Sequence, residues 1–382
     1  MSDQLRYFGP APANWVRTTV FDHDVVVVGA GQAGLGIGFA LRRAGIGRAT
    51  VVDAAAPGEA GVWTTTARMR TLRTPKAWPE PEYGFPELSF RAWYEGRYDE
   101  AAYDELDRIP RTVWAGYVAW FEQTVKVAVR NHTRLIGVTP AADHLVLRLA
   151  VTRPDAGVDE VVETTRKLVL ANGVEGTGGP YLPPPVADLP RHLAAHTGDR
   201  IDFPALAGQV VAVLGAGASA LDAAGTALEA GASEVHLFTR RPELIVQGPK
   251  AGPAQNLGGR EHFHRRSDAD RWRAKASAAG AGRSCTLESV QHASAFSGFR
   301  VHLSAPWHHA RVEDGKVRVD AADGSHLFDF VIAGTGYQYN PRTRPELAEI
   351  ADHVALWADR YQPPSELSDE SLARFPYLGG GY

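Results

Sequence analysis

One sequence unit occurs twice in this chain and constrains its fold more than any other feature. Residues 24–53 and 209–241 each contain an apolar strand, a glycine-rich turn, a helix, a glycine stop and a second apolar strand. A strand–helix–strand unit of this kind opens a dinucleotide-binding fold. We therefore predict an α/β protein with two Rossmann-like dinucleotide-binding domains.

Both turns share a pattern of small residues, and each position has its own physical task. The first glycine makes a tight turn, the second lets backbone amides approach a pyrophosphate, and the third position keeps the helix close to the strand. The helix start then presents N–H groups to the phosphates. The predicted cofactor-binding residues are Gly29, Ala30, Gly31, Gln32, Ala33 and Gly34 in the first turn, and Gly215, Gly217, Ala218, Ser219 and Ala220 in the second.

The residue 24 positions after the first glycine distinguishes the two ligands. In the first unit it is Asp53, whose carboxylate can accept hydrogen bonds from ribose hydroxyls. In the second unit it is Thr239, followed by Arg240 and Arg241. Arginine can clamp a 2′-phosphate that a carboxylate would repel, although the pair could also simply solvate a strand end. We predict FAD in the first site and NADPH in the second.

The domain boundaries follow from the stiff segment Gly178–Pro185, which lies between the two units. We expect the NADPH domain to be inserted into the FAD domain. The expected segments are 1–190 for the first part of the FAD domain, 191–325 for the NADPH domain and 326–382 for the return to the FAD domain.

Two glycine-rich connections are expected to act as paired hinges between these domains. One connection is residues 171–173, at the end of a predicted strand. The other follows the predicted strand at 328–333. We assign Thr335, in the second connection, to the cofactor site. Because no helix follows the last glycine-rich stretch at 379–382, we expect either a truncated chain or a shortened flavin domain.

Composition excludes several function classes. The single cysteine, Cys285, excludes a disulfide scaffold, a four-cysteine metal site and a CxxC redox pair within the chain. A net charge of −4 gives no reason to expect a nucleic-acid partner. The N-terminus resembles no secretory signal, and the two longest uncharged stretches contain glycines and polar residues. We therefore expect a cytoplasmic protein without a membrane partner.

Two further groups of residues were weighed as sites. His262 and His264 lie in an arginine-rich loop that would repel a cation, so we expect no metal there and somewhat favour contact with a nucleotide or acidic substrate. Asn256 could contact NADP or substrate. The roles of these residues stay open.

Several motifs together resemble class B flavin-dependent monooxygenases, which include flavin-containing monooxygenases, amine N-hydroxylases and Baeyer–Villiger enzymes. They are the two turns and the segments 61–63, 70–76, 182–183, 196–199 and 333–337. The resemblance covers residues 24–340 and implies that NADPH reduces FAD, which then forms a peroxyflavin with O2. The implied activity is oxygenation of a soft nucleophile, an amine or sulfide of a small molecule. The resemblance also implies that four residues lie beside the flavin ring: Trp63, Leu72, Arg73 and Thr74.

The chain departs from this family at one signature, FxGxxxHxxx followed by an aromatic residue. Pro190 and His192 replace the first two signature residues, His196 is retained, and Arg200 replaces the aromatic one. Baeyer–Villiger enzymes have tryptophan at that last position, so oxygenation of nitrogen or sulfur is favoured over ketones. A flavin-dependent NADPH reductase without oxygenation, or a nucleotide-binding sensor without turnover, stays open. No catalytic residue, substrate or oligomeric state is assigned.

Overall fold

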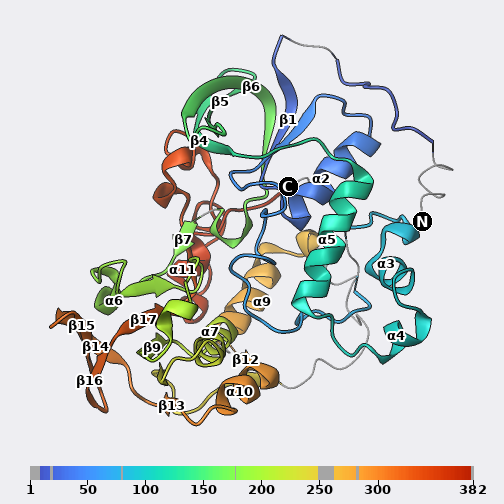
Figure 1. Ribbon diagram of the computed structural model, residues 1–382. Coiled ribbons are helices and arrows are strands. Elements are labelled where there is room, and N and C mark those ends of the chain that lie inside the picture. Colours follow the sequence, from blue (N-terminus) through green and yellow to red (C-terminus); the bar gives the residue numbers. More distant parts are fainter. Residues whose placement is uncertain are drawn as a thin grey trace.

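In the computed structural model, strand β1 (His23–Val28) lies inside the first of two large sheets, in which β3, β2, β1 and β6 are parallel and β5 and β4 continue antiparallel. The structure describes residues 9–17, 20–78, 81–176, 178–247, 262–280 and 284–379. Figure 1 shows the first sheet at the top of the molecule and the second below it. The predicted α/β class with Rossmann-like units is confirmed.

The first sheet has six strands in the order β3-β2-β1-β6-β5-β4. Its parallel part is buried on both faces, as the valine run of β1 predicts. Helices α2 and α5 pack together through Phe39 and Phe121, whose ring centroids lie 6.0 Å apart. The other elements of this half are β2 (Ala49–Val52), α3 (Phe90–Glu95), α4 (Glu100–Glu105), α5 (Arg111–Val125), β3 (Val129–Arg130), β4 (Thr133–Pro140), β5 (Leu145–Thr152) and β6 (Val158–Leu170), with α2 spanning Gln32–Arg43.

The second sheet has five parallel strands in the order β13-β10-β9-β17-β8. Strand β17 (Phe330–Ala333) lies between β9 and β8, so we move the proposed start of the return segment from residue 326 to residue 334. An apolar strand does not reveal from its sequence which sheet it joins. The other elements are β8 (Ala194–His196), β9 (Val210–Leu214), α7 (Ala218–Glu229), β10 (Glu234–Phe238), β11 (Val246–Gln247), α9 (Asp268–Gly280), β12 (Cys285–Thr286), α10 (Leu287–Ser294) and β13 (Phe299–His302).

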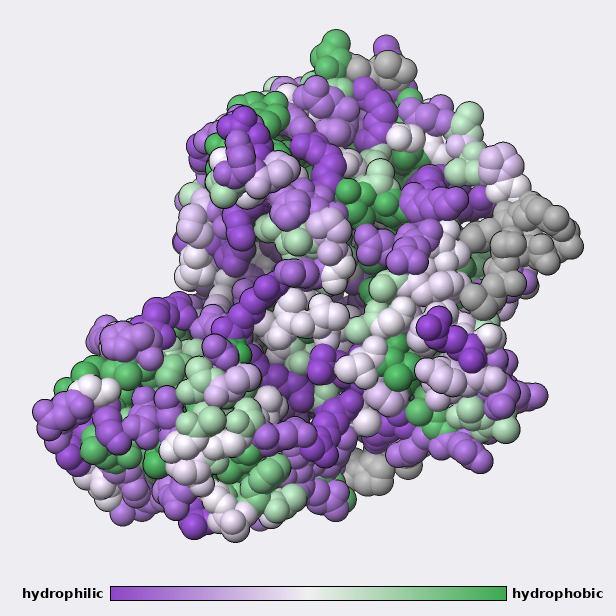
Figure 2. Space-filling view, viewed as in Figure 1, coloured by the Kyte–Doolittle hydropathy of each residue, from purple (hydrophilic) through white to green (hydrophobic). Residues whose placement is uncertain are grey.

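A small antiparallel sheet extends from this half. It comprises β14 (Trp307–Glu313), β15 (Lys316–Ala321) and β16 (Gly324–Phe328). It projects at the lower left of Figure 1, and Figure 2 shows an indentation between this projection and the upper part of the molecule. Its inner face packs on the second sheet through Val317, Val319 and Phe328, all buried.

The two connections between the sheets run side by side. Strand β7 (Gly178–Pro180) pairs antiparallel with β18 (Tyr337–Tyr339). The pairing is close, because a Cβ atom on Gly178 would lie 1.9 Å from the carbonyl oxygen of Gln338. The chain therefore crosses between the sheets as a short two-stranded ribbon, next to the helix α6 (Pro184–Ala187).

The segment after β18 packs on both halves of the molecule. Leu347 and Ile350 contact the core under β4 and β5 of the first sheet. Further along, the Trp357 ring lies 5.8 Å from that of Trp272 on α9. This segment contains short 3₁₀ turns and the helix α11 (Glu370–Ala373).

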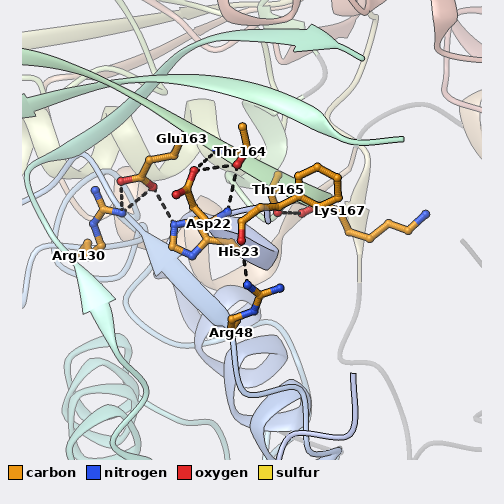
Figure 3. A network of polar contacts seen from close by, with 9 residues as sticks. Asp22, His23, Arg48, Arg130, Glu163, Thr164, Thr165 and Lys167 are labelled. Atoms are coloured by element: carbon orange, nitrogen blue, oxygen red, sulfur yellow. Dashed lines mark hydrogen bonds and ion pairs between the residues drawn. The ribbon is translucent and has the colours of Figure 1, made fainter. Parts of the chain in front are cut away.

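Charged residues link three strands of the first sheet (Figure 3). Arg130 donates to Glu163 at 2.8 Å, and the His23 ring lies 2.9 Å from the same carboxylate. Although burial raises the pKa of Glu163, these two hydrogen bonds hold it below its usual value. The network joins β1, β3 and β6. None of the described helices is both long and apolar enough to cross a membrane.

Candidate functional site

The first glycine-rich turn forms a cradle that side chains cannot occupy. Gly29 has φ +103°, and a Cβ atom there would lie 2.5 Å from the carbonyl oxygen of Ala171. A Cβ atom on Gly34 would lie 1.7 Å from the carbonyl oxygen of Gly29. Gly31 differs, because its nearest neighbour would be the Cα atom of Gly61 at 3.4 Å. A Cβ atom on Gly31 would therefore make an ordinary van der Waals contact without overlap, and Gly31 caps α2 without a side-chain hydrogen bond.

Asp53 lies beside this turn, at the carboxyl end of β2. Its two carboxylate oxygens accept hydrogen bonds from the backbone N–H groups of Ala30 and Ala55, each at 2.7 Å. Each oxygen keeps acceptor capacity for a ribose hydroxyl. The open helix start and the oriented carboxylate together fit a dinucleotide such as FAD.

A cavity of about 350 Å³ adjoins the same turn. Five of the predicted residues line it: Gln32, Ala33, Trp63, Leu72 and Thr74. The sequence interpretation missed the rest of the lining, which is Pro75, Lys76, Trp78, Pro81, Tyr83, Ile109 and Trp114. Trp114 belongs to α5 and packs with Phe90 and Tyr117 in a buried cluster. It is 5% exposed, so it contributes to both core and cavity.

Gln32 is fixed in this cavity by two tryptophans. The indole N–H groups of Trp63 and Trp114 donate to its Oε1 atom at 2.9 and 3.0 Å. The two rings meet edge to face, with centroids 6.3 Å apart. With its oxygen occupied by both indoles, the Gln32 amide has its NH₂ group to offer to a bound ligand.

Arg73 does not line the cavity. It forms an ion pair with Asp222 on α7, and the Ser289 hydroxyl donates to the other oxygen of Asp222 at 2.6 Å. Burial raises the pKa of Asp222, against the opposing effect of Arg73. Arg73, which the family resemblance implies lies beside the flavin ring, thus also joins the two halves of the molecule.

The second turn repeats the geometry of the first. Gly215 has φ +116°, and a Cβ atom there would lie 2.4 Å from the carbonyl oxygen of Gly334. Gly217 caps α7 without a side-chain hydrogen bond, and Ala218 and Ser219 begin the helix. Ala220 is fully buried and packs against Gly334, which explains why the third position must be small.

Arg241 follows the strand β10 and has an uncommitted donor. Its Nη1 atom is buried and has no hydrogen-bond partner among the described residues. The backbone is fixed, because the Arg241 N–H donates to the Thr239 hydroxyl at 3.2 Å. Arg240 next to it is exposed. Two guanidinium groups at this strand end fit the 2′-phosphate of NADPH.

Two other positions singled out in the sequence have structural contacts. The Thr335 hydroxyl donates to the carbonyl oxygen of Tyr181, which ties the two crossing connections together. Arg200, in place of the family's aromatic residue, forms a 3.1 Å ion pair with Glu59. His262 is exposed and His264 partly buried, and Asn256 lies outside the described residues.

His196, the retained signature residue, is 1% exposed. Its Nδ1 atom accepts the Gly198 N–H at 2.9 Å, and its ring meets that of Tyr337 at 5.1 Å. Burial lowers its pKa, which favours a neutral ring.

Two dinucleotide cradles with a cavity beside the first define a two-nucleotide oxidoreductase. Comparison with known proteins makes this specific. Residues 23–255 match the model of the pyridine nucleotide-disulphide oxidoreductase family, and the chain belongs to that family. The chain has a single cysteine, Cys285, which is buried. Because a disulfide needs two cysteines, the chain cannot form an internal disulfide of the kind in the family's name.

One curated relative is the FAD-dependent urate hydroxylase of Xanthomonas campestris pathovar campestris. The identity is 40% over 378 residues, which cover 96% of this chain and 77% of the relative. Among solved structures, the fold is similar to ornithine hydroxylase from Pseudomonas aeruginosa, with a TM-score of 0.71, 17% identity and coverage of 87% and 86%. It is also similar to the cadaverine monooxygenase from Erwinia amylovora, with a TM-score of 0.68, 16% identity and coverage of 91% and 85%.

These matches confirm several predictions. The chain is a flavin-dependent monooxygenase, an oxidoreductase that uses FAD and NADP(H). A small-molecule substrate and O2 are its reaction partners.

Proposed function

We propose that this monooxygenase hydroxylates a small, planar, electron-rich nitrogen heterocycle of the urate kind, with NADPH as reductant. The observation that carries this proposal is the aromatic cavity beside the first turn. Its volume of about 350 Å³ suits one small ring system, and three tryptophans contribute to its lining. The name of the relative at 40% identity supports the same substrate class.

The polar lining suits an anionic heterocycle such as urate. Lys76 lines the cavity, and its ammonium group donates to the carbonyl oxygens of Tyr103 and Asp104 at 2.6 and 3.1 Å. It therefore provides a fixed positive charge close to the lining. The amide of Gln32, held by Trp63 and Trp114, offers N–H donors to a ring oxygen or nitrogen. Aromatic walls exclude water from the reacting atoms.

When bound, FAD supplies hydride acceptance and the activation of O2. The chain holds it through the cradle at Gly29, Gly31 and Gly34 and through Asp53. Arg240 and Arg241 bind the 2′-phosphate of NADPH at the second site. Gln32 orients the substrate, and Lys76 balances its charge. The substrate must be a soft nucleophile, whether its reacting atom is carbon, nitrogen or sulfur.

The outcome to be distinguished experimentally is a reductase reaction, in which NADPH is oxidised without oxygen transfer to a substrate. Three statements stay predictions from the sequence. They are the domain boundaries, the cytoplasmic location and the absence of nucleic-acid and membrane partners.

The test is NADPH oxidation and O2 uptake by the purified, FAD-loaded protein with urate, a diamine, a sulfide and a ketone. We expect urate to accelerate both and to be consumed in equal amount with NADPH. Lys76→Met should lower kcat/KM for urate at least about tenfold, while Lys275→Met, an exposed lysine on α9, should leave it unchanged. Acceleration by the diamine or sulfide alone would overturn the urate assignment. NADPH oxidation that yields only peroxide with all four would favour the reductase.

A further inference from the structure

Five polar side chains form a continuous cluster where the β13–β10 edge of the second sheet meets the small antiparallel sheet. Glu234 and His236 belong to β10, His302 ends β13, Asp323 lies in the turn after β15, and His326 belongs to β16. These elements meet at the lower end of the molecule in Figure 1. No sequence pattern indicates this cluster, because its residues come from three separate segments.

The contacts in the cluster are short and directional. The His236 ring lies 3.0 Å from Glu234 on one side and 2.9 Å from His302 Nε2 on the other. His302 Nδ1 lies 2.5 Å from Asp323 Oδ2, and His326 Nε2 lies 3.2 Å from Asp323 Oδ1. Arg300 is the nearby cation, and it lies 3.7 Å from the outer oxygen of Glu234.

The row from Glu234 through His236 and His302 to Asp323 is continuous, because each ring nitrogen lies within hydrogen-bond distance of the next polar group. A cation bound between His302 and Asp323 would meet a ring nitrogen and a carboxylate oxygen, both of which are common metal ligands.

Three ligand atoms converge where that cation would bind. His302 Nδ1, an Asp323 carboxylate oxygen and His326 Nε2 all lie within 4.8 Å of one another. Around tetrahedral zinc, with bonds of about 2.0–2.1 Å, ligand atoms lie about 3.4 Å apart. The contact between His302 and Asp323 would open by roughly 1 Å to reach that geometry.

The surrounding residues suit metal ligation as well. With Nδ1 on the metal, His302 would donate its Nε2–H to His236, which would donate in turn to Glu234. Such carboxylate–histidine relays orient ligating imidazoles in known metal sites. Phe238 stacks on the His302 ring with centroids 4.2 Å apart and an interplanar angle of 10°, which fixes the ring orientation.

We propose that His302, Asp323 and His326 form a binding site for a divalent transition metal, with zinc as the representative ion. Two imidazoles and a carboxylate are ligands that zinc commonly takes, and water would complete the coordination. The metal would join the edge strand β13 to the turn and strand of the small sheet, so the site is structural rather than part of the oxygenation chemistry.

The test is titration of tag-free, chelator-treated, FAD-loaded protein with ZnCl2, followed by isothermal calorimetry and thermal unfolding. We expect one equivalent of zinc bound with a Kd of about 10 µM or tighter, and a rise in Tm. Asp323→Asn and His326→Gln should each weaken binding at least about tenfold. His236→Gln, one shell further out, should weaken it about 10- to 100-fold without changing the stoichiometry.

Matched controls come from the same small sheet. His308 and His309 on β14 are exposed and take no part in the cluster, so His308→Gln and His309→Gln should bind zinc as the wild type does. FAD content and far-UV circular dichroism report whether each variant is folded. The proposal is overturned if the folded wild type binds no zinc up to about 100 µM. It is equally overturned if Asp323→Asn and His326→Gln keep the wild-type Kd.

Discussion

At the scale of single residues, the three glycines of the first turn carry different constraints. Gly29 and Gly34 are restricted by the protein's own backbone, since a Cβ atom would lie 2.5 Å and 1.7 Å from carbonyl oxygens. Gly31 is restricted instead by the ligand of this turn, because a Cβ atom on Gly31 would lie 3.4 Å from its nearest protein neighbour. A pattern of three glycines therefore combines a folding requirement with a ligand requirement.

This difference predicts separable mutant phenotypes. Gly31→Val should give folded protein whose affinity for FAD falls at least about tenfold, because the side chain occupies the space left for the pyrophosphate. Gly34→Ala should fail to fold, because its methyl group overlaps the carbonyl oxygen of Gly29. Gly116→Ala in α5, where the nearest atoms are 3.7 Å away, is the control. Bound flavin and circular dichroism are the measurements. A Gly31→Val protein with full FAD content would refute the assignment of this turn.

The second residue-scale prediction concerns cofactor choice. Charge-assisted hydrogen bonds contribute roughly 1.5–3 kcal/mol, so Arg240→Ala and Arg241→Ala should each raise the KM for NADPH about tenfold or more. The KM for NADH should hardly change, because NADH has no 2′-phosphate. Steady-state kinetics with both nucleotides measure the effect. Equal losses with NADH and NADPH would show that the arginines do not read the phosphate.

At the scale of elements, local patterns could be predicted from the sequence and long-range pairings could not. The strand–turn–helix units follow from glycine and valine spacing within about 30 residues. The sheet that β17 joins, and the partner of Arg73, depend on segments more than 100 residues away in the chain. Thr74 lines the cavity, whereas its neighbour Arg73 turns toward α7. The spacing of residues in the sequence does not determine which of two adjacent side chains points into the cavity and which points away from it.

The pair of Arg73 and Asp222 predicts a pH-dependent stability. Burial raises the pKa of Asp222, so the native state holds this proton more tightly than the unfolded chain does. The corresponding stability is fully present below the unfolded pKa and is lost as pH rises through the higher native pKa. Arg73→Leu removes the opposing charge and should raise that pKa further. It should lower the free energy of unfolding by about 3 kcal/mol at neutral pH, and by less near pH 4.

The measurement is urea unfolding at both pH values. Adding Asp222→Asn to Arg73→Leu should remove the extra pH dependence, because the titrating carboxylate is gone. Arg70→Leu is the control, since its ion pair with Glu229 is about half exposed and should contribute about 0–1 kcal/mol. If Arg73→Leu lost the same stability at both pH values, its effect would come from packing rather than from charge.

At the scale of the whole molecule, two connections determine how the halves are oriented. The ribbon of β7 and β18 carries both crossings, and the hydroxyl of Thr335 bridges to Tyr181 beside it. Ion pairs and hydrogen bonds across the interface add to this connection, including Thr71 to Glu288 at 2.6 Å. Hydride transfer between the two nucleotides requires the halves to adopt a defined relative position. The ribbon should therefore affect the rate of flavin reduction more than the affinity for either cofactor.

Two adjacent glycines in this ribbon test that inference. A Cβ atom on Gly178 would lie 1.9 Å from the carbonyl oxygen of Gln338, whereas nothing lies within 4 Å of one on Gly179. Gly178→Ala should therefore force β7 and β18 apart and slow flavin reduction by NADPH about tenfold or more, since small misplacements of reacting groups carry large rate penalties. FAD content and the Kd for NADPH should stay near wild type, because both cradles lie outside the ribbon. Gly179→Ala should reduce its flavin at the wild-type rate.

Anaerobic stopped-flow mixing measures this step apart from the reaction with O2, because it follows the loss of oxidised flavin absorbance. Unchanged reduction in folded Gly178→Ala protein would mean that the interface contacts alone, without the ribbon, align the two nucleotides.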